Sequence, residues 1–213
     1  FNNMRKFTTY QLSCNFAEIM ILFFGVLFGL PLPLSAIQIL FMNIVTSDIP
    51  AITLGLNPHS DDIMKNKPRR KSELLTKELF FMLVLAGVIM GAFTLGVFYF
   101  VLNIRGESLE VARSSALVTL IIFEIANAFN FRSFRKGVLN RSLFVNKPLL
   151  FASIISILAT VFILYTPLNS VFETVSLHYI YWILAAAVSL IVIFAFDILK
   201  FVNNKKRFWE EYI

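Results

Sequence analysis

Six stretches of the sequence are long and apolar enough to cross a lipid bilayer as helices. They cover roughly residues 11–30, 34–54, 79–102, 114–131, 149–166 and 178–200, and the first helix is expected to begin earlier, near residue 5. A bilayer core about 30 Å thick is spanned by about 20 apolar helical residues. The runs are too continuously apolar for the alternating strands of an outer-membrane barrel. The sequence therefore predicts an all-α membrane protein, a bundle of six transmembrane helices.

The composition agrees with a chain that is largely covered by lipid. Hydrophobic residues make up 58% of the 213 residues and the mean hydropathy is +0.76, whereas soluble domains are typically about 45 to 50% apolar. The remaining polar segments are short, so we expect residues 1–213 to form a single transmembrane domain. The longest polar segment, residues 55–77, is too charged to enter lipid and is predicted to be a cytoplasmic loop that can touch a cytoplasmic partner.

The basic residues predict the orientation. Of the 19 lysines and arginines, all but Arg105 and Arg113 lie before the first run, between the second and third, between the fourth and fifth, or at and after the end of the sixth. Short basic loops stay in the cytoplasm, so both termini are expected there. The net charge of +6 is then a topology signal and a contact for anionic lipid, and we expect no nucleic-acid partner. Because the chain opens with Phe1 rather than Met, we expect it to have been cut from something longer or processed.

Three acidic residues fall deep inside predicted spans: Glu18, Asp48 and Glu124. A carboxylate at the centre of a bilayer costs about 2.5 to 3.5 kcal/mol on insertion scales, so it needs a partner or a cation. None of the predicted spans offers a central lysine or arginine. Carboxylate, amide and carbonyl oxygens suit hard metal ions, so the pattern predicts a cation site.

Amides accompany two of these acids at helical spacing. Asn15 and Glu18 are three residues apart, about 60° on a helical wheel, so they share one face. Glu124 is followed at the same spacing by Asn127 and Asn130. An alternative stays open, because polar residues between packed helices often only bond one another.

The second run carries a similar cluster before a proline. Asn43, Thr46 and Ser47 precede Pro50, which lacks an N–H and whose ring collides with the carbonyl of Thr46. We expect a discontinuous helix with a carbonyl free to bind an ion. The candidate metal ligands are Asn15, Glu18, Asn43, Thr46, Ser47, Asp48 and Glu124.

Small residues mark a close helix contact. Gly87 and Gly91 lie four residues apart in the third run, with Gly96 beyond them. Such a face lets another helix approach closely, and we interpret it as packing rather than as a site.

Several segments resemble the P-type cation-transporting ATPases, in particular the calcium-pump branch. FNNMRKFTTYQLSCNFAEI is similar to the stalk and start of the family's fifth membrane helix, LPLSAIQILFMNIVTSDIPAITLGLNP to the sixth, LIIFEIANAFNFRS to the eighth and FDILKF to the tenth. DIMKNKPR, residues 62–69, resembles the loop that leans on the phosphorylation domain.

The resemblance carries expectations for the site. It implies the fifth to tenth membrane helices of such a pump, with Ca²⁺ or a similar cation as the transported ion. It also places five residues on ligand positions: Asn15, Glu18, Asn43, Thr46 and Glu124. Where the calcium-pump pattern has Asp directly after Thr46, this sequence has Ser47, and Asp48 follows. On an ideal helix Ser47 would point about 40° from Asn43 and Asp48 about 140° from it.

The catalytic parts of the family are not in this sequence. It contains neither DKTGT nor TGES, nor a glycine-rich phosphate loop. We therefore expect no bound nucleotide and no ATP hydrolysis by this chain alone, with cytoplasmic phosphorylation and nucleotide-binding domains as partners.

The sequence is compatible with three functions. The first is the cation-binding and translocating membrane part of a pump. The second is a non-transporting membrane scaffold or partner subunit that keeps the pump's fold, with self-association as one of its roles. The third, a passive channel or secondary transporter, lacks the expected internal repeat.

Overall fold

The structure, a computed structural model, describes residues 1–56, 74–134, 137–138 and 143–206. Every regular element in these ranges is helical, which confirms the predicted all-α fold class. Most of the predicted loop 55–77 lies outside the described residues. The elements are α1 (Asn2–Leu27), α2 (Ala36–Phe41), the π-helix η1 (Met42–Ser47), α3 (Asp48–Gly55), α4 (Lys77–Tyr99), the π-helix η3 (Phe100–Ile104), α5 (Leu109–Phe131), η4 (Leu143–Val145), α6 (Lys147–Tyr165), η5 (Pro167–Ser170) and α7 (Tyr179–Lys206).

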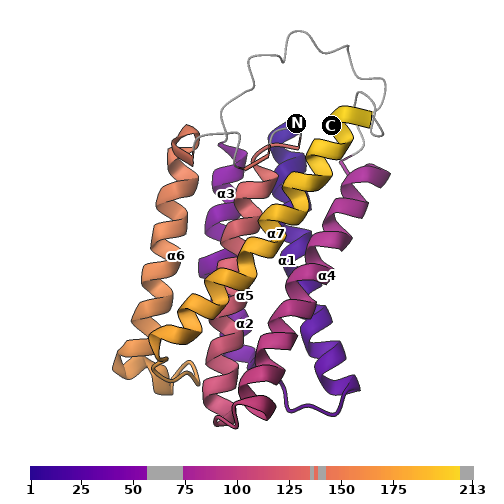
Figure 1. The fold of residues 1–213 in the computed structure, drawn as a ribbon. Helices are drawn as coiled ribbons and strands as arrows, with labels where there is room; N and C mark the ends of the chain where they lie inside the picture. Colours follow the sequence, from indigo (N-terminus) through magenta and orange to yellow (C-terminus); the bar gives the residue numbers. More distant parts are fainter. Residues whose placement is uncertain (57–73, 135–136, 139–142, 207–213) are drawn as a thin grey trace.

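The helices run up and down in one bundle (Figure 1). Its passes in chain order are α1, the composite α2–η1–α3, α4 with η3, α5, α6 and α7. α5 runs through the middle, where it contacts α1, α4, α6 and α7. The start of α1 and the end of α7 lie at the same end of the bundle (Figure 1).

Within the described residues, five segments are long and apolar enough to cross a membrane. They are Asn2–Leu27, Ala36–Gly55, Lys77–Ile104, Lys147–Tyr165 and Tyr179–Val202. α5, the sixth predicted span, is not in this set; most of its residues are buried in the bundle, among them the polar Ser115, Thr119, Glu124 and Asn127. Neighbouring helices rather than lipid surround those side chains, so α5 does not need an apolar surface on every side.

The predicted break before Pro50 takes another form. The helix continues through Pro50, which lies in the first turn of α3, and the distortion precedes it as η1. The N–H of Asp48 bonds to the carbonyl of Asn43, five residues earlier rather than four. A proline is tolerated in a first turn because its missing N–H would have no regular helical partner there.

The glycines of α4 lie against α1. A Cβ added at Gly87 would lie 2.5 Å from Cδ1 of Phe16 and 3.1 Å from the carbonyl oxygen of Ser13, and one at Gly91 would lie 3.0 Å from Cβ of Met20. A Cβ at Gly96 would meet nothing within 4 Å. The first two glycines therefore let α4 pack directly on the part of α1 that carries Glu18, as the spacing predicted.

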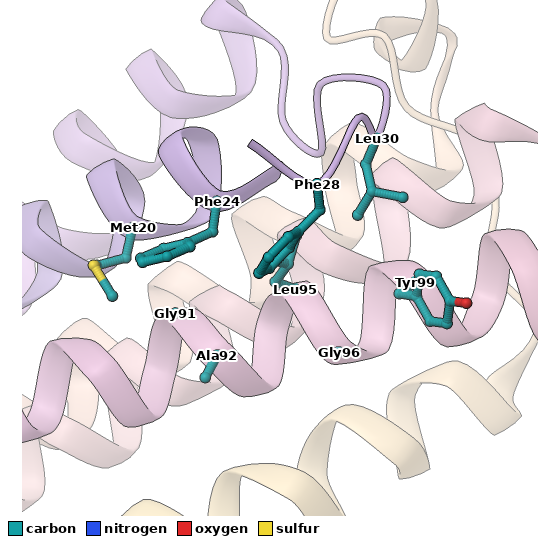
Figure 2. A pocket seen from close by; sticks show the side chains of 9 residues that line it. All are labelled: Met20, Phe24, Phe28, Leu30, Gly91, Ala92, Leu95, Gly96 and Tyr99. Carbon is teal, nitrogen blue, oxygen red and sulfur yellow. The ribbon is translucent and has the colours of Figure 1, made fainter. Parts of the chain in front are cut away.

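An apolar groove of about 490 Å³ lies between the last turns of α1 and α4 (Figure 2). Phe24, in the last turn of α1, and Phe28, which follows α1, project toward α4 (Figure 2). The lining residues are Met20, Phe24, Phe28, Leu30, Gly91, Ala92, Leu95, Gly96 and Tyr99. None of them is a candidate ligand, and a lining of this kind suits hydrocarbon rather than an ion.

Candidate functional site

Two buried carboxylates converge on η1. Glu18 of α1 is 6% exposed and Glu124 of α5 is fully buried. Nδ2 of Asn43 donates to Oε2 of Glu18 at 3.2 Å, and Oγ1 of Thr46 donates to Oε2 of Glu124 at 3.1 Å. Asn43 and Thr46 are three residues apart in the same π-helix. The acids therefore approach one turn of backbone from two different helices and face the same region.

Each carboxylate also has an oxygen without a hydrogen-bond partner in the structure. The same is true of three neutral groups that the sequence singled out as ligands. These buried, unbonded oxygens are Asn15 Oδ1, Glu18 Oε1, Asn43 Oδ1, Ser47 Oγ and Glu124 Oε1. A buried polar atom without a partner costs about 1 to 3 kcal/mol, so a group of them is an unfavourable arrangement unless something else binds there.

Asn43, Thr46 and Ser47 all belong to the π-helix η1. Thr46 and Ser47 are fully buried. The hydroxyl of Thr46 also lies 3.0 Å from the carbonyl of Met42, which gives it a local acceptor besides Glu124. Glu18 lies close enough to Glu124 for the two carboxylates to interact electrostatically.

Asp48 is placed differently from the other candidates. Its side chain is exposed, and Oδ1 accepts a hydrogen bond of 2.9 Å from Nε2 of Gln11. At the position where the sequence departs from the calcium-pump pattern, the buried residue is thus Ser47. The structure brings Asp48 to the edge of α1 rather than between the two glutamates.

The other amides of α5 have structural partners. Nδ2 of Asn127 donates to Oγ of Ser13 at 2.8 Å, and Nδ2 of Asn130 donates to the carbonyl of Val192 at 3.4 Å. These bonds join α5 to α1 and to α7. The contact from Ser13 was missed in the sequence, because a single serine in a mostly apolar run carries no signal of its own.

A second missed residue is Ser156 of α6. Its hydroxyl lies 3.3 Å from the carbonyl oxygen of Val45 in η1. The signal that would have pointed to it is the spacing of Ser153, Ser156 and Thr160, which places three hydroxyls on one face of an otherwise apolar helix.

Comparison with known proteins identifies the family. Residues 31–202 match the family model described as cation transporting ATPase, C-terminus. The chain belongs to this family. A calcium-transporting ATPase of Bacillus subtilis is 37% identical over 196 residues, which cover 91% of this chain and 22% of that protein. Calcium-transporting ATPase 1 of Bacillus cereus is 32% identical over 220 residues, covering 96% of the chain and 25% of that protein.

The human calcium-transporting ATPase type 2C member 1 is more distant, at 29% identity over 97% of this chain and 23% of its own length. The chain thus spans about a quarter or less of the length of these relatives. The matches confirm the resemblance to the C-terminal membrane region of P-type ATPases of the calcium-pump branch.

The oxygens around η1 in this cation-transporting ATPase C-terminal region can be compared with the ligands that hard cations prefer. The described residues contain no group of three or more His, Cys, Asp or Glu side chains that could hold a metal. Two carboxylates with amide and hydroxyl oxygens remain, and hard cations accept such mixed oxygen shells. The arrangement provides up to two negative charges, enough to balance one divalent ion.

Proposed function

We propose that this region binds a divalent cation, Ca²⁺ in the first instance, between α1, η1 and α5, and passes it across the membrane as part of a P-type pump. One observation carries the proposal: Glu18 and Glu124 each accept a hydrogen bond from a residue of η1, and each keeps one buried oxygen unbonded. Ca²⁺ prefers six to eight oxygen ligands. The names of the relatives, all calcium-transporting ATPases, support the choice of ion.

The ligand roles follow from the positions. Glu18 and Glu124 would supply charge, and Asn15, Asn43 and Ser47 neutral oxygens. The hydroxyl of Thr46 would either orient Glu124 by its hydrogen bond or bind the ion through its own oxygen. We keep Asp48, the remaining candidate, as a ligand only of a state in which the chain before Pro50 is rearranged, because here its carboxylate is exposed and bonded to Gln11.

The rest of the transport cycle would depend on other parts of a pump. The chain has no phosphorylation or nucleotide-binding motif, so ATP hydrolysis belongs to cytoplasmic domains that act on α1 and on the loop 55–77. The cytoplasmic placement of both termini is supported by the distribution of basic residues and by the shared end of α1 and α7 (Figure 1). Movement of α1 relative to α5 would open or close the space between the two glutamates.

Calorimetric titration of the purified chain with calcium at neutral pH tests the proposal. Glu18→Gln and Glu124→Gln each remove one charged ligand, and we expect at least about 100-fold weaker binding, since loss of even a supporting partner of a metal ligand costs 10- to 100-fold. Glu110→Gln, an exposed acid in the first turn of the same α5, is the matched control and should bind calcium normally. Absence of binding to the unmodified chain at millimolar calcium, or equal binding by all three variants, would refute it.

The scaffold alternative gives a different thermal result. If the glutamates bind calcium, calcium at 100 times its Kd should stabilise the unmodified protein by about 2.7 kcal/mol and should not stabilise Glu18→Gln to that extent. In an idle scaffold, Glu18→Gln would be the more stable protein and calcium would have no effect, because an unpaired buried acid is only a liability.

A further inference from the structure

We propose that Ser156 of α6 is a positioning residue for the cation site. Its hydroxyl bonds the carbonyl of Val45, whose partner in the π register would be Pro50, a residue without an N–H, and so it stabilises η1 in that register. This inference rests on the proposed function for its consequence for ion binding. The contact between Ser156 and Val45 can be tested independently of that function.

The need for a donor follows from the backbone of η1. In the π register the carbonyl of residue i pairs with the N–H of residue i+5, as the bond from Asp48 to Asn43 shows. Five residues after Val45 stands Pro50, which has no N–H. Backbone carbonyls inside a protein are normally hydrogen-bonded, so a carbonyl that has lost its π-register partner is stabilised by a donor from another helix.

Ser156 is that donor. It is fully buried on α6, and its Oγ lies 3.3 Å from the carbonyl oxygen of Val45 and 3.0 Å from that of Ala152. A hydroxyl has one proton, so it can serve either acceptor and exchange between them. The hydroxyl of Ser156 can therefore bond η1 in its present register. When η1 moves, the same hydroxyl can donate to the carbonyl of Ala152 on its own helix.

The neighbouring hydroxyls of α6 differ in this respect. The hydroxyl of Ser153 donates to the carbonyl of Leu149 at 2.8 Å, and that of Thr160 donates to the carbonyl of Ser156 at 2.7 Å. Both contacts lie within α6. Ser156 is thus the member of this face whose hydroxyl reaches the site-forming segment.

The register of η1 decides where the ligands point. Val45 lies between Asn43, which donates to Glu18, and Thr46, which donates to Glu124. A return to α-helical register would remove one residue from the turn, and one residue corresponds to a rotation of about 100°. The two donors could then no longer serve glutamates that approach η1 from different helices, so the hydroxyl of Ser156 stabilises the paired arrangement.

The experiment compares three serine variants of the whole chain in calcium titrations. Ser156→Ala removes the donor and should weaken calcium binding about three- to tenfold, the equivalent of one hydrogen bond. Ser156→Thr keeps a hydroxyl and should restore most of the affinity, whereas Ser153→Ala, the matched control, should stay within about twofold of the unmodified chain, as expected for a contact confined to its own helix. Calcium affinity in Ser156→Ala equal to that of the unmodified chain would overturn the proposal.

A second measurement does not involve calcium. Pro50→Ala returns an N–H to the position five residues after Val45, so Ser156→Ala should lower the thermal midpoint less in a Pro50→Ala background than in the unmodified chain. Additive effects of the two substitutions would show that the hydroxyl and Pro50 are unrelated, and would overturn the inference. If the unmodified chain binds no calcium, the proposed function fails together with the role of Ser156 in ion binding. A non-additive cycle would show in that case that the contact with Val45 itself is correct.

Discussion

Two regions of this bundle contain buried charged side chains, and they differ in how those side chains are hydrogen-bonded. At the ends of α5 and α7, Lys200 is 1% exposed and donates from Nζ to the carbonyl of Asn130 at 2.6 Å. Close by, Oδ1 of Asp197 accepts a hydrogen bond of 2.7 Å from the N–H of Val138. At the candidate cation site, Glu18 and Glu124 each use one oxygen and leave the other unbonded. Buried charge is therefore common to both regions, and the candidate site is distinguished by carboxylate oxygens that have no hydrogen-bond partner.

The largest effect on stability is expected at the structural region. Lys200→Met keeps much of the length of the side chain but removes the donor to Asn130, at the C-terminal end of α5 where a cation is favourable. We expect a loss of about 2 to 3 kcal/mol in the free energy of unfolding in detergent, since a hydrogen bond from a charged donor contributes about 1.5 to 3 kcal/mol, and no change in calcium affinity. Lys147→Met, at an exposed position in the first turn of α6, is the control and should cost little. An unchanged free energy of unfolding in Lys200→Met would contradict this comparison, because it would show that the charge of Lys200 does not stabilise the fold.

An intermediate effect is expected from the packing that positions Glu18. Gly87→Ala would bring a methyl group against Phe16 and the backbone of Ser13, in the part of α1 just before Glu18. Overpacking of this kind costs about 1 to 3 kcal/mol, and the displaced α1 should bind calcium about tenfold more weakly, measured by titration. Gly96→Ala is the matched control, because its Cβ meets nothing and alanine is the better helix former. Equal calcium affinities in the two variants would mean that α4 does not position the site.

The smallest effect separates the two residues at the departure from the calcium-pump pattern. Ser47→Ala removes a buried, unbonded oxygen near Glu124 and should weaken calcium binding about threefold, as expected for one neutral contact. Asp48→Asn, on the exposed side beside Gln11, should change the affinity by less than about twofold, as expected for a solvent-exposed charge. The reverse order of effects would show that Asp48 turns inward in the ion-bound state.

The sequence predicted the membrane fold and several contacts of the site. Hydropathy located α1, α4, α6 and α7 because apolar runs of about 20 residues match the thickness of a bilayer and are uncommon in soluble domains. The convergence of Glu18 and Glu124 followed from deep acids without basic companions. The ideal helical wheel already turned Ser47 toward Asn43 and Asp48 away from it.

Other features depend on tertiary contacts that a single sequence does not display. Pro50 predicted a disturbed helix, but not the form of the disturbance. Whether a helix breaks, kinks or widens into a π turn depends on which other groups can bond its carbonyls. Here one such group is the hydroxyl of Ser156, on a helix far along the chain. The buried polar residues of α5 are explained only by the helices around them. Asn127 and Asn130 had the spacing of ligands, and their partners, Ser13 and the carbonyl of Val192, lie on other helices.

The most direct test of the central claim is to locate the ion itself. Crystals of the chain grown with calcium should show an anomalous difference peak between α1, η1 and α5, within about 2.3 to 2.6 Å of Oε1 of both Glu18 and Glu124, the distance range of calcium–oxygen bonds. A fully occupied peak that lies elsewhere, for example beside Asp48 and Gln11, or the lack of any peak between the two glutamates at saturating calcium, would contradict the account.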